Sequence, residues 1–133
     1  MLVMVGPDVP EALAEQLGER FHVVRSTGML EADASPERLF FAAQRNGVAA
    51  IVTNDEPIHE ETRRIKDHHE QDGGPGPPMP FEVLRWREGD HAVSDLAKEL
   101  SAIERRRGEE ESLLSRLSEE TRRERGYRSD RRR

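Results

Sequence analysis

Short apolar runs alternate with longer amphipathic stretches over most of the chain. The apolar runs at residues 2–5, 21–25, 48–52 and 81–86 have the length and composition of β-strands. The run at 48–52, Val-Ala-Ala-Ile-Val, has no polar alternation, which is typical of a strand buried on both faces of a parallel sheet. We therefore expect this strand to lie at the centre of the sheet.

Amphipathic helices are predicted between these strands. The first is expected to begin at Asp8, whose side chain is suited to cap a helix N-terminus. The second has the clearest boundaries, with Ser35 as N-cap, Pro36 at the first helical position and Asn-Gly at 46–47 as the stop. A third is expected over about 58–70. The β-α order predicts an α/β fold, a small three-layer domain with a four-stranded, mainly parallel sheet.

The last third of the chain is predicted to be helical. A Gly/Pro-rich connector at 72–78 leads into the fourth strand, and a long helix is expected to start at Asp90 or Ser94. Its apolar stripe, expected to cover the sheet or an edge of it, consists of Val93, Leu96, Leu100 and Ile103. Gly108 is expected to break this helix, and a second helix then follows. We therefore predict an α/β domain over residues 1–107 and a charged, helical, arginine-rich tail over 108–133.

Composition narrows the chemistry that is available. With 133 residues, of which 34% are hydrophobic, the chain can form one small core. The absence of cysteine excludes disulfides and thiolate metal sites, which leaves carboxylates and five histidines as the strong metal ligands, and we expect a bound metal to be a hard ion. No apolar run is long enough to span a membrane, and residues 1–5 are too short and lack the basic lead of a signal peptide. We therefore expect a cytoplasmic protein with no membrane contact.

Charge is distributed unevenly between the two parts. The net charge is −9 over residues 1–100 and +3 over residues 101–133. The tail, which also contains Tyr127, could neutralise phosphates and stack on a base of RNA; it could equally be a solvated segment or a contact for the acidic body. The predicted nucleic-acid contacts in the tail are Arg122, Arg123, Arg125, Arg128, Arg131, Arg132 and Arg133.

A polar segment follows the central strand directly. Thr53, Asn54, Asp55 and Glu56 supply a hydroxyl, an amide and two carboxylates at the point where open α/β sheets bind their ligands. These groups could converge on a cation or a phosphate. The alternative interpretation is an ordinary turn, in which Asn54 or Asp55 caps the next helix.

Three segments of the chain resemble the PIN-like nuclease family, in particular the short lineage found in toxin–antitoxin settings. They read MLVMVGPDVPEALAEQL, FHVVRSTGM and SPERLFFAAQRNGVAAIVTNDEPI, and the resemblance extends over about residues 1–88. Members of that family typically have an acid at the end of the first strand, another at the start of the helix before the central strand, and a V-T-x-D motif after that strand. The resemblance implies a carboxylate cluster that holds Mg²⁺ or Mn²⁺ and hydrolyses RNA.

The chain departs from this family pattern at three of the acidic positions. Gly6, Pro36 and Pro57 stand where the family has acids, and Asp55 is the acid that is clearly retained. Because metal-dependent hydrolysis needs two or more carboxylates on the ion, we predict a decayed metal site in a non-catalytic module that binds RNA or a protein and regulates it. A protein partner would bind through the C-terminal helices. Aspartate at positions 6 and 36 is expected to restore metal affinity, since glycine leaves no side chain to displace.

The alternative prediction is that the protein is an active enzyme. In it, Asp8, Glu37 and Asp55 form a rearranged catalytic cluster and, together with Glu56, bind one divalent metal ion. Thr53 and Asn54 would then orient water or contact the nucleic-acid phosphate, while the arginine tail attracts RNA. This reading predicts a ribonuclease that depends on Mg²⁺ or Mn²⁺.

Overall fold

A computed structural model describes residues 1–31, 34–73 and 80–131, while the side chains of residue 72 and of residues 118–131 lie outside the described part. The chain divides into two compact units, Met1–Leu100 and Ser101–Arg133, compared with the predicted division at 107/108. The first unit contains the sheet. The second is helical in its described part.

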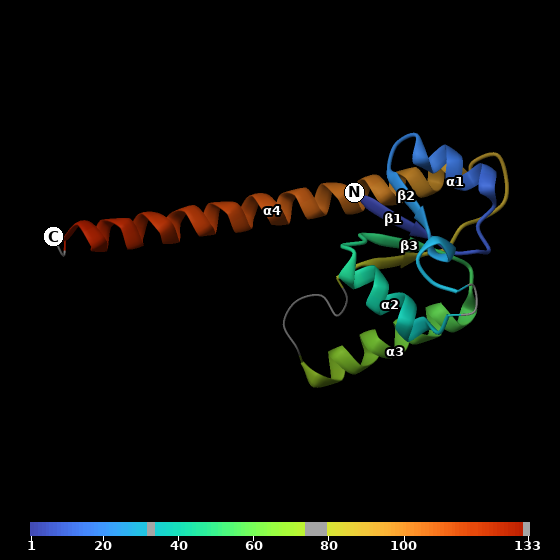
Figure 1. Cartoon of the computed structure of the whole chain (residues 1–133), viewed down its shortest axis with the longest axis horizontal. Helices are drawn as coiled ribbons and strands as arrows, with labels where there is room; N and C mark the ends of the chain where they lie inside the picture. The colour runs from blue at the N-terminus through green and yellow to red at the C-terminus, as the bar shows by residue number, and fades with distance from the viewer. Residues whose placement is uncertain (32–33, 74–79, 132–133) are drawn as a thin grey trace. The chain divides into compact units, whose positions relative to one another are not determined.

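Four parallel strands form one sheet in the order β2-β1-β3-β4 (Figure 1). The strands are β1 Leu2–Val5, β2 His22–Arg25, β3 Ala50–Val52 and β4 Glu82–Leu84. Within this sheet Met4 pairs with Ile51, and Ile51 in turn pairs with Val83. All three residues of β3 are buried. The predicted α/β fold with a parallel sheet and an inner apolar strand is therefore confirmed.

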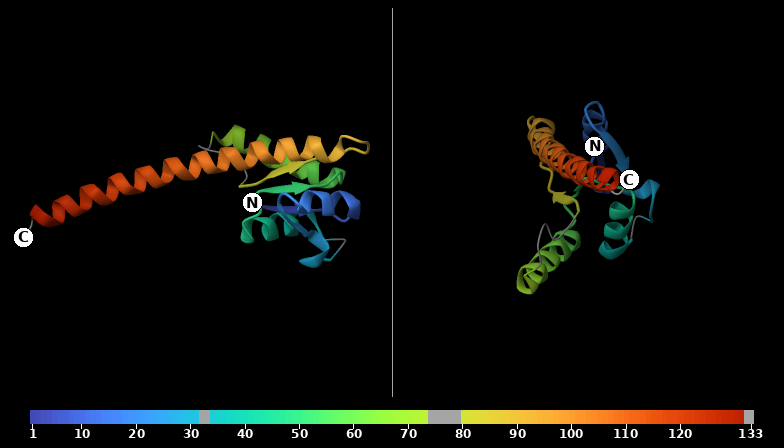
Figure 2. Two further views of the ribbon diagram at one scale, coloured as in Figure 1. Left: turned by 90° about the horizontal axis from the view of Figure 1, so that it is seen from above. Right: turned by 90° about the vertical axis from the view of Figure 1, so that its left-hand side faces the viewer.

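Helices cover both faces of the sheet and make a three-layer domain (Figures 1 and 2). The α-helices are α1 Glu11–Gly18, α2 Pro36–Arg45, α3 Glu56–Asp72 and α4 Ala92–Arg131, and a short 3-10 helix spans Ser26–Gly28. In the first unit, α2 and α3 lie on one face, and α1 and the first turns of α4 lie on the other.

The core consists of two apolar layers separated by the sheet. On one face, Met4 and Ile51 pack with side chains of α2 and α3, and the rings of Phe40 and Phe81 lie 5.4 Å apart at 60°. Because side chains alternate along a strand, neighbours of Met4 such as Val5 point to the other face. That face is covered by buried side chains of the flanking helices, namely Leu13, Leu17, Leu96 and Leu100.

Helix α2 begins and ends as the sequence predicts. The Ser35 hydroxyl accepts a hydrogen bond from the Arg38 N–H at 3.3 Å, and Pro36 occupies the first helical position. At the other end, Asn46 is the C-cap, and Gly47 adopts a φ of +69°, which favours glycine. These local signals fix the helix that leads into β3.

Two predicted helix boundaries are wrong. Asp8 does not cap α1, because that helix starts at Glu11, and Pro10 in the N-cap position makes no side-chain cap. Gly108 does not break a helix, since it lies inside α4. None of the helices in the described part is long and apolar enough to cross a membrane.

Candidate functional site

The carboxyl ends of β1, β3 and β4 bring together residues that are far apart in the sequence. Asp8 follows β1, Thr53 and Asn54 follow β3, and Trp86 follows β4. In a parallel sheet these ends lie at one edge, where open α/β folds bind their ligands. We call this group, Asp8, Thr53, Asn54 and Trp86, the edge cluster.

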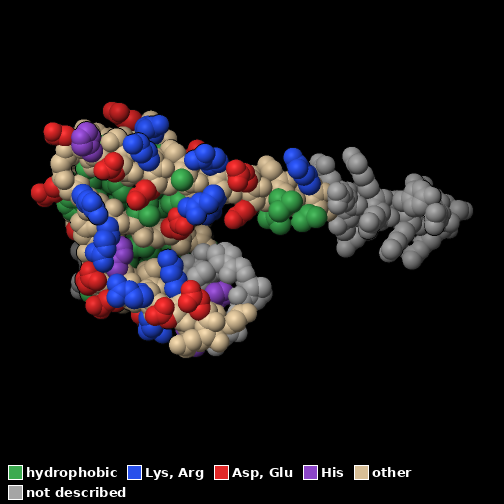
Figure 3. Space-filling model, turned by 180° about the vertical axis from the view of Figure 1, so that it is seen from behind, with side chains coloured by type: hydrophobic (Ala, Val, Ile, Leu, Met, Phe, Trp, Pro, Cys, Tyr) green, Lys and Arg blue, Asp and Glu red, His purple; other side chains and the backbone are tan. Residues whose placement is uncertain are grey.

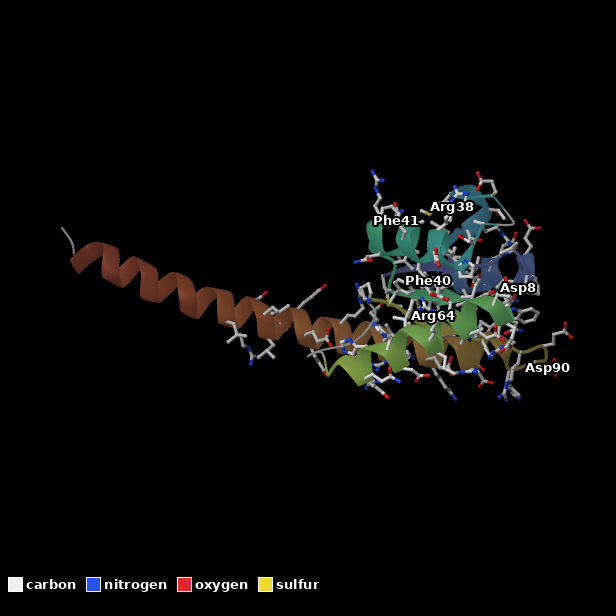
Figure 4. The ribbon with its side chains drawn as sticks, turned by 90° about the horizontal axis from the view of Figure 1, so that it is seen from below. Asp8, Arg38, Phe40, Phe41, Arg64 and Asp90 are labelled. Carbon is white, nitrogen blue, oxygen red and sulfur yellow. The ribbon has the colours of Figure 1, made fainter. Side chains whose placement is uncertain are left out.

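Asp8 is the centre of the edge cluster. Its Oδ1 accepts a hydrogen bond from the Thr53 hydroxyl at 2.6 Å. Its Oδ2 accepts two more, from the Asn54 backbone N–H at 2.8 Å and from the Trp86 indole Nε1–H at 2.8 Å. One carboxylate therefore ties together the ends of three strands. Figure 4 labels Asp8 at this end of the domain.

The hydrogen bonds also set the charge of Asp8. Partial burial raises the pKa of the carboxyl, but the bonds from Thr53, Asn54 and Trp86 outweigh burial and bring the pKa below its ordinary value of 3.8. Asp8 is therefore ionised at neutral pH, and it places a fixed negative charge at the edge of the sheet.

Asn54 extends the pairing of β3 and β4 beyond the strands themselves. The Thr53 N–H donates to the Leu84 carbonyl at 2.9 Å, continuing the ladder. The Asn54 side chain then binds the backbone of Trp86 at both groups, donating from Nδ2 to the carbonyl at 2.8 Å and accepting the N–H on Oδ1 at 3.0 Å. The backbone and the indole of Trp86 are thus both held in place.

Gly6 is required by the close approach of these side chains. A Cβ at position 6 would lie 2.6 Å from Asp8 Oδ1 and 2.9 Å from Thr53 Oγ1, both shorter than ordinary contacts allow. The expectation that an aspartate at position 6 displaces nothing is therefore wrong. Any side chain there has to move the carboxylate of Asp8.

The other two carboxylates after β3 do not join the edge cluster. Asp55 is the N-cap residue of α3 but makes no side-chain cap, and its own N–H donates to Thr53 Oγ1 at 3.1 Å. Glu56 forms an ion pair with Arg85 at 2.9 Å, and the hydrogen bond and charge of this arginine lower the pKa of Glu56. Neither Asn54 nor Asp55 therefore caps α3 with its side chain, contrary to the alternative interpretation of this segment. The Asn54 side chain binds the backbone of Trp86 instead.

Glu37 lies elsewhere, in the first turn of α2. It lines a surface hollow together with Met29, Arg38 and Phe41. In Figure 4, Phe41 and Arg38 on α2 lie apart from Asp8. Among the described residues, no group of three or more His, Asp or Glu side chains could hold a metal ion. The structure therefore does not assemble the predicted ligands Asp8, Glu37, Asp55 and Glu56 as one site, and their catalytic roles stay predictions.

Comparison with protein-family models, with curated proteins and with solved structures gave no match. The resemblance to PIN-like nucleases therefore stays a prediction that rests on the motifs in the sequence. The edge cluster has to be interpreted from its own geometry.

Sequence reasoning missed the residues that flank the edge cluster. Arg85 and Arg87 are exposed on either side of the partly buried Trp86. The signal was present, because Arg-Trp-Arg stands at the end of the predicted fourth strand, where a ligand edge is expected.

The predicted contacts in the arginine tail cannot be placed in the same way. The helix backbone extends to Arg131. The side chains of the predicted RNA contacts lie outside the described part of the structure; these contacts are Arg122, Arg123, Arg125, Arg128, Arg131, Arg132 and Arg133.

Proposed function

We propose that this chain is a non-catalytic RNA-binding module whose contact surface is the edge cluster with its two flanking arginines. The observation that supports this most is the way in which Trp86 is held. Its indole N–H binds Asp8, its backbone binds Asn54, and exposed arginines lie before and after it. A fixed aromatic ring between two cations is suited to a base with its adjacent phosphates.

The two kinds of side chain would contribute differently. Stacking of a base on an aromatic ring is worth about 1–3 kcal/mol and tolerates any base, because every base has a π-face. Arg85 and Arg87 would neutralise phosphates. Arg85 already pairs with Glu56, but both side chains are about half exposed, and such surface pairs contribute little to stability. Replacement of the Glu56 carboxylate by an RNA phosphate as the partner of Arg85 therefore costs little free energy.

The non-catalytic part of the proposal is supported by the carboxylates. Hydrolysis by a metal-bound water needs several oxygen ligands that converge on the ion. Asp8 already accepts three hydrogen bonds from protein donors, and Glu56 is paired with Arg85. The net charge of −9 over residues 1–100 also repels RNA, so affinity is expected to depend on the few cations at the edge and in the tail.

Trp86 provides a direct test because it is the one tryptophan in the chain. Titration with single-stranded RNA is expected to quench its fluorescence to saturation. Arg87→Gln should weaken binding severalfold and reduce its salt dependence. Arg20→Gln serves as the matched control, because Arg20 is exposed and precedes β2, at the opposite edge of the sheet, and it should bind as the wild type does.

Two substitutions of Trp86 separate the contribution of base stacking from that of the indole N–H. Trp86→Phe keeps the aromatic ring but loses the indole N–H, so it should retain part of the affinity, whereas Trp86→Ala should lose stacking entirely. RNA binding, followed with a labelled strand, that is equal in both variants and the wild type would contradict the assignment of this surface. If the wild type does not bind RNA, the RNA-binding proposal is wrong, and a protein is then the expected partner of the non-catalytic module.

One observation favours a second candidate, the metal-dependent ribonuclease. The carboxylate of Asp8 lies 2.6 Å from the place of a Cβ at position 6, where the resembled family has its first acid. Asp8 would then substitute for that acid, with Asp55 as a second ligand for Mg²⁺ or Mn²⁺. Cleavage of single-stranded RNA with Mn²⁺ that disappears in Asp55→Asn would establish this candidate and exclude the non-catalytic module.

A further inference from the structure

One face of α4 in the second unit carries an open hollow. Its lining residues recur at intervals of three and four and so lie on one side of the helix; they are Arg105, Gly108, Glu109, Ser112, Leu113 and Arg116. Leu113 is 58% exposed and lies at the rim of this face; together with Leu114 and Leu117, which lie further round the helix, it forms an apolar patch on the surface of α4 (Figure 3). A contiguous patch of exposed large apolar side chains is typical of a surface that packs against a partner.

Between Glu109 and Arg116 the order of side chains along this face is self-complementary. Glu109 lies one turn before Leu113, and Arg116 lies one turn after it. We propose that this face pairs with the same face of a second copy of the chain, with the two helices antiparallel. Glu109 of each copy then meets Arg116 of the other. Each Leu113 enters the space between Glu109, Ser112 and Arg116 of the opposite helix, as a knob enters a hole.

The charges of Glu109 and Arg116 favour a second copy of the chain as the partner and an antiparallel direction of the two helices. Within one helix, Glu109 and Arg116 are seven residues apart, which is about 10 Å along the axis, so they are too distant to pair with each other. A parallel second copy would place Glu109 against Glu109 and Arg116 against Arg116. Only the antiparallel arrangement pairs opposite charges at both ends, and it does so twice because of the twofold symmetry.

The small residues of the face allow the helices to approach closely. Nothing lies within 4 Å of the place that a Cβ of Gly108 would occupy, and Ser112 follows one turn later on the same side. A single helix crossing buries less than the roughly 1,200–2,000 Å² of a standard interface. Association is therefore weak, concentration-dependent and reduced by salt.

Charge reversal in the full-length chain tests the pairing. By analytical ultracentrifugation at increasing protein concentration, the wild type should pass from monomer to dimer. Glu109→Arg and Arg116→Glu should each stay monomeric, because each places like charges together at both ends of the pair. An equimolar mixture of these two variants should dimerise again, since each restores the opposite charge for the other. Circular dichroism of each variant verifies that the helix is retained.

Introduced cysteines test the direction, because the chain has none of its own. Ser112→Cys lies near the twofold axis and should form an intermolecular disulfide under mild oxidation. Ser101→Cys is the matched control: an antiparallel pair separates the two copies of position 101, whereas a parallel pair would bring them together.

Three results would overturn the proposal. The wild type could remain monomeric at every concentration, which would leave the face to a different protein. The mixed charge variants could fail to associate although the wild type dimerises. Ser101→Cys could form the disulfide as readily as Ser112→Cys.

Discussion

The leucines of the two units differ in how far their side chains are exposed. In the α/β unit, Leu17 and Leu100 are fully buried, together with most of the other large apolar side chains. In the second unit, Leu113, Leu114 and Leu117 are between 51% and 62% exposed. The first unit is therefore stabilised by its own core, whereas the second unit, in which Ile103 is buried, presents large exposed leucines at positions 113, 114 and 117.

The largest effect that separates the two units is expected from the same substitution made in each. Leu17→Ala should lower the free energy of unfolding by about 2–5 kcal/mol, because it leaves a cavity in the core. Leu113→Ala should change it by about 0.5 kcal/mol or less, as is usual at an exposed position. Urea denaturation at low protein concentration, where single chains dominate, measures both. Equal losses would show that Leu113 is packed within one chain.

A smaller effect is expected at the edge cluster. Gly6→Ala forces the side chains of Asp8 and Thr53 apart, and we expect a loss of about 1–3 kcal/mol of stability. Gly18→Ala is the control, since nothing lies within 4 Å of its Cβ position and it belongs to helix α1. That variant should be neutral or slightly more stable. A Gly6→Ala protein as stable as the control would mean that the edge cluster is not rigid.

The pH dependence of stability isolates the contribution of Asp8. Because the pKa of Asp8 is lower in the folded state than its ordinary value of 3.8, the ionised carboxylate stabilises the fold at pH values above 3.8. That contribution is lost as the pH falls from 3.8 through the folded pKa. Asp8→Asn removes it, so the stability difference between wild type and variant should be constant near neutral pH and shrink in acid. A difference that is the same at pH 7 and in acid would contradict the role of the charge.

The sequence predicts those parts of the fold that depend on local signals. The apolar runs locate the strands, and Ser35 with Pro36 locates the start of α2, because each acts within a few residues. Local signals are misleading where a residue has a stronger distant partner. Asp8 has the features of a helix cap, but it binds Trp86, which is 78 residues away.

The candidate site is predictable to a similar extent. The rule for parallel sheets correctly places Thr53 and Asn54 at the ligand edge. It does not reveal that Asn54 binds the backbone of Trp86, because that contact depends on the register between β3 and β4. The alternative, enzymatic prediction groups Glu37 with Asp8, but Glu37 lies on α2 and lines a different surface.

The smallest effect is expected at Gly108, where a local signal and the structure disagree. Glycine costs a helix interior about 1 kcal/mol relative to alanine, yet α4 continues through this residue. Because space is open around the Cβ position, Gly108→Ala should raise the helix content seen by circular dichroism without changing the unfolding of the α/β unit. Gly108→Pro should lower the helix content, again with the unfolding of that unit unchanged. A shift of the main unfolding transition in either variant would show that the two units unfold together, and the contrast between a domain with its own core and a helix that unfolds separately would then fail.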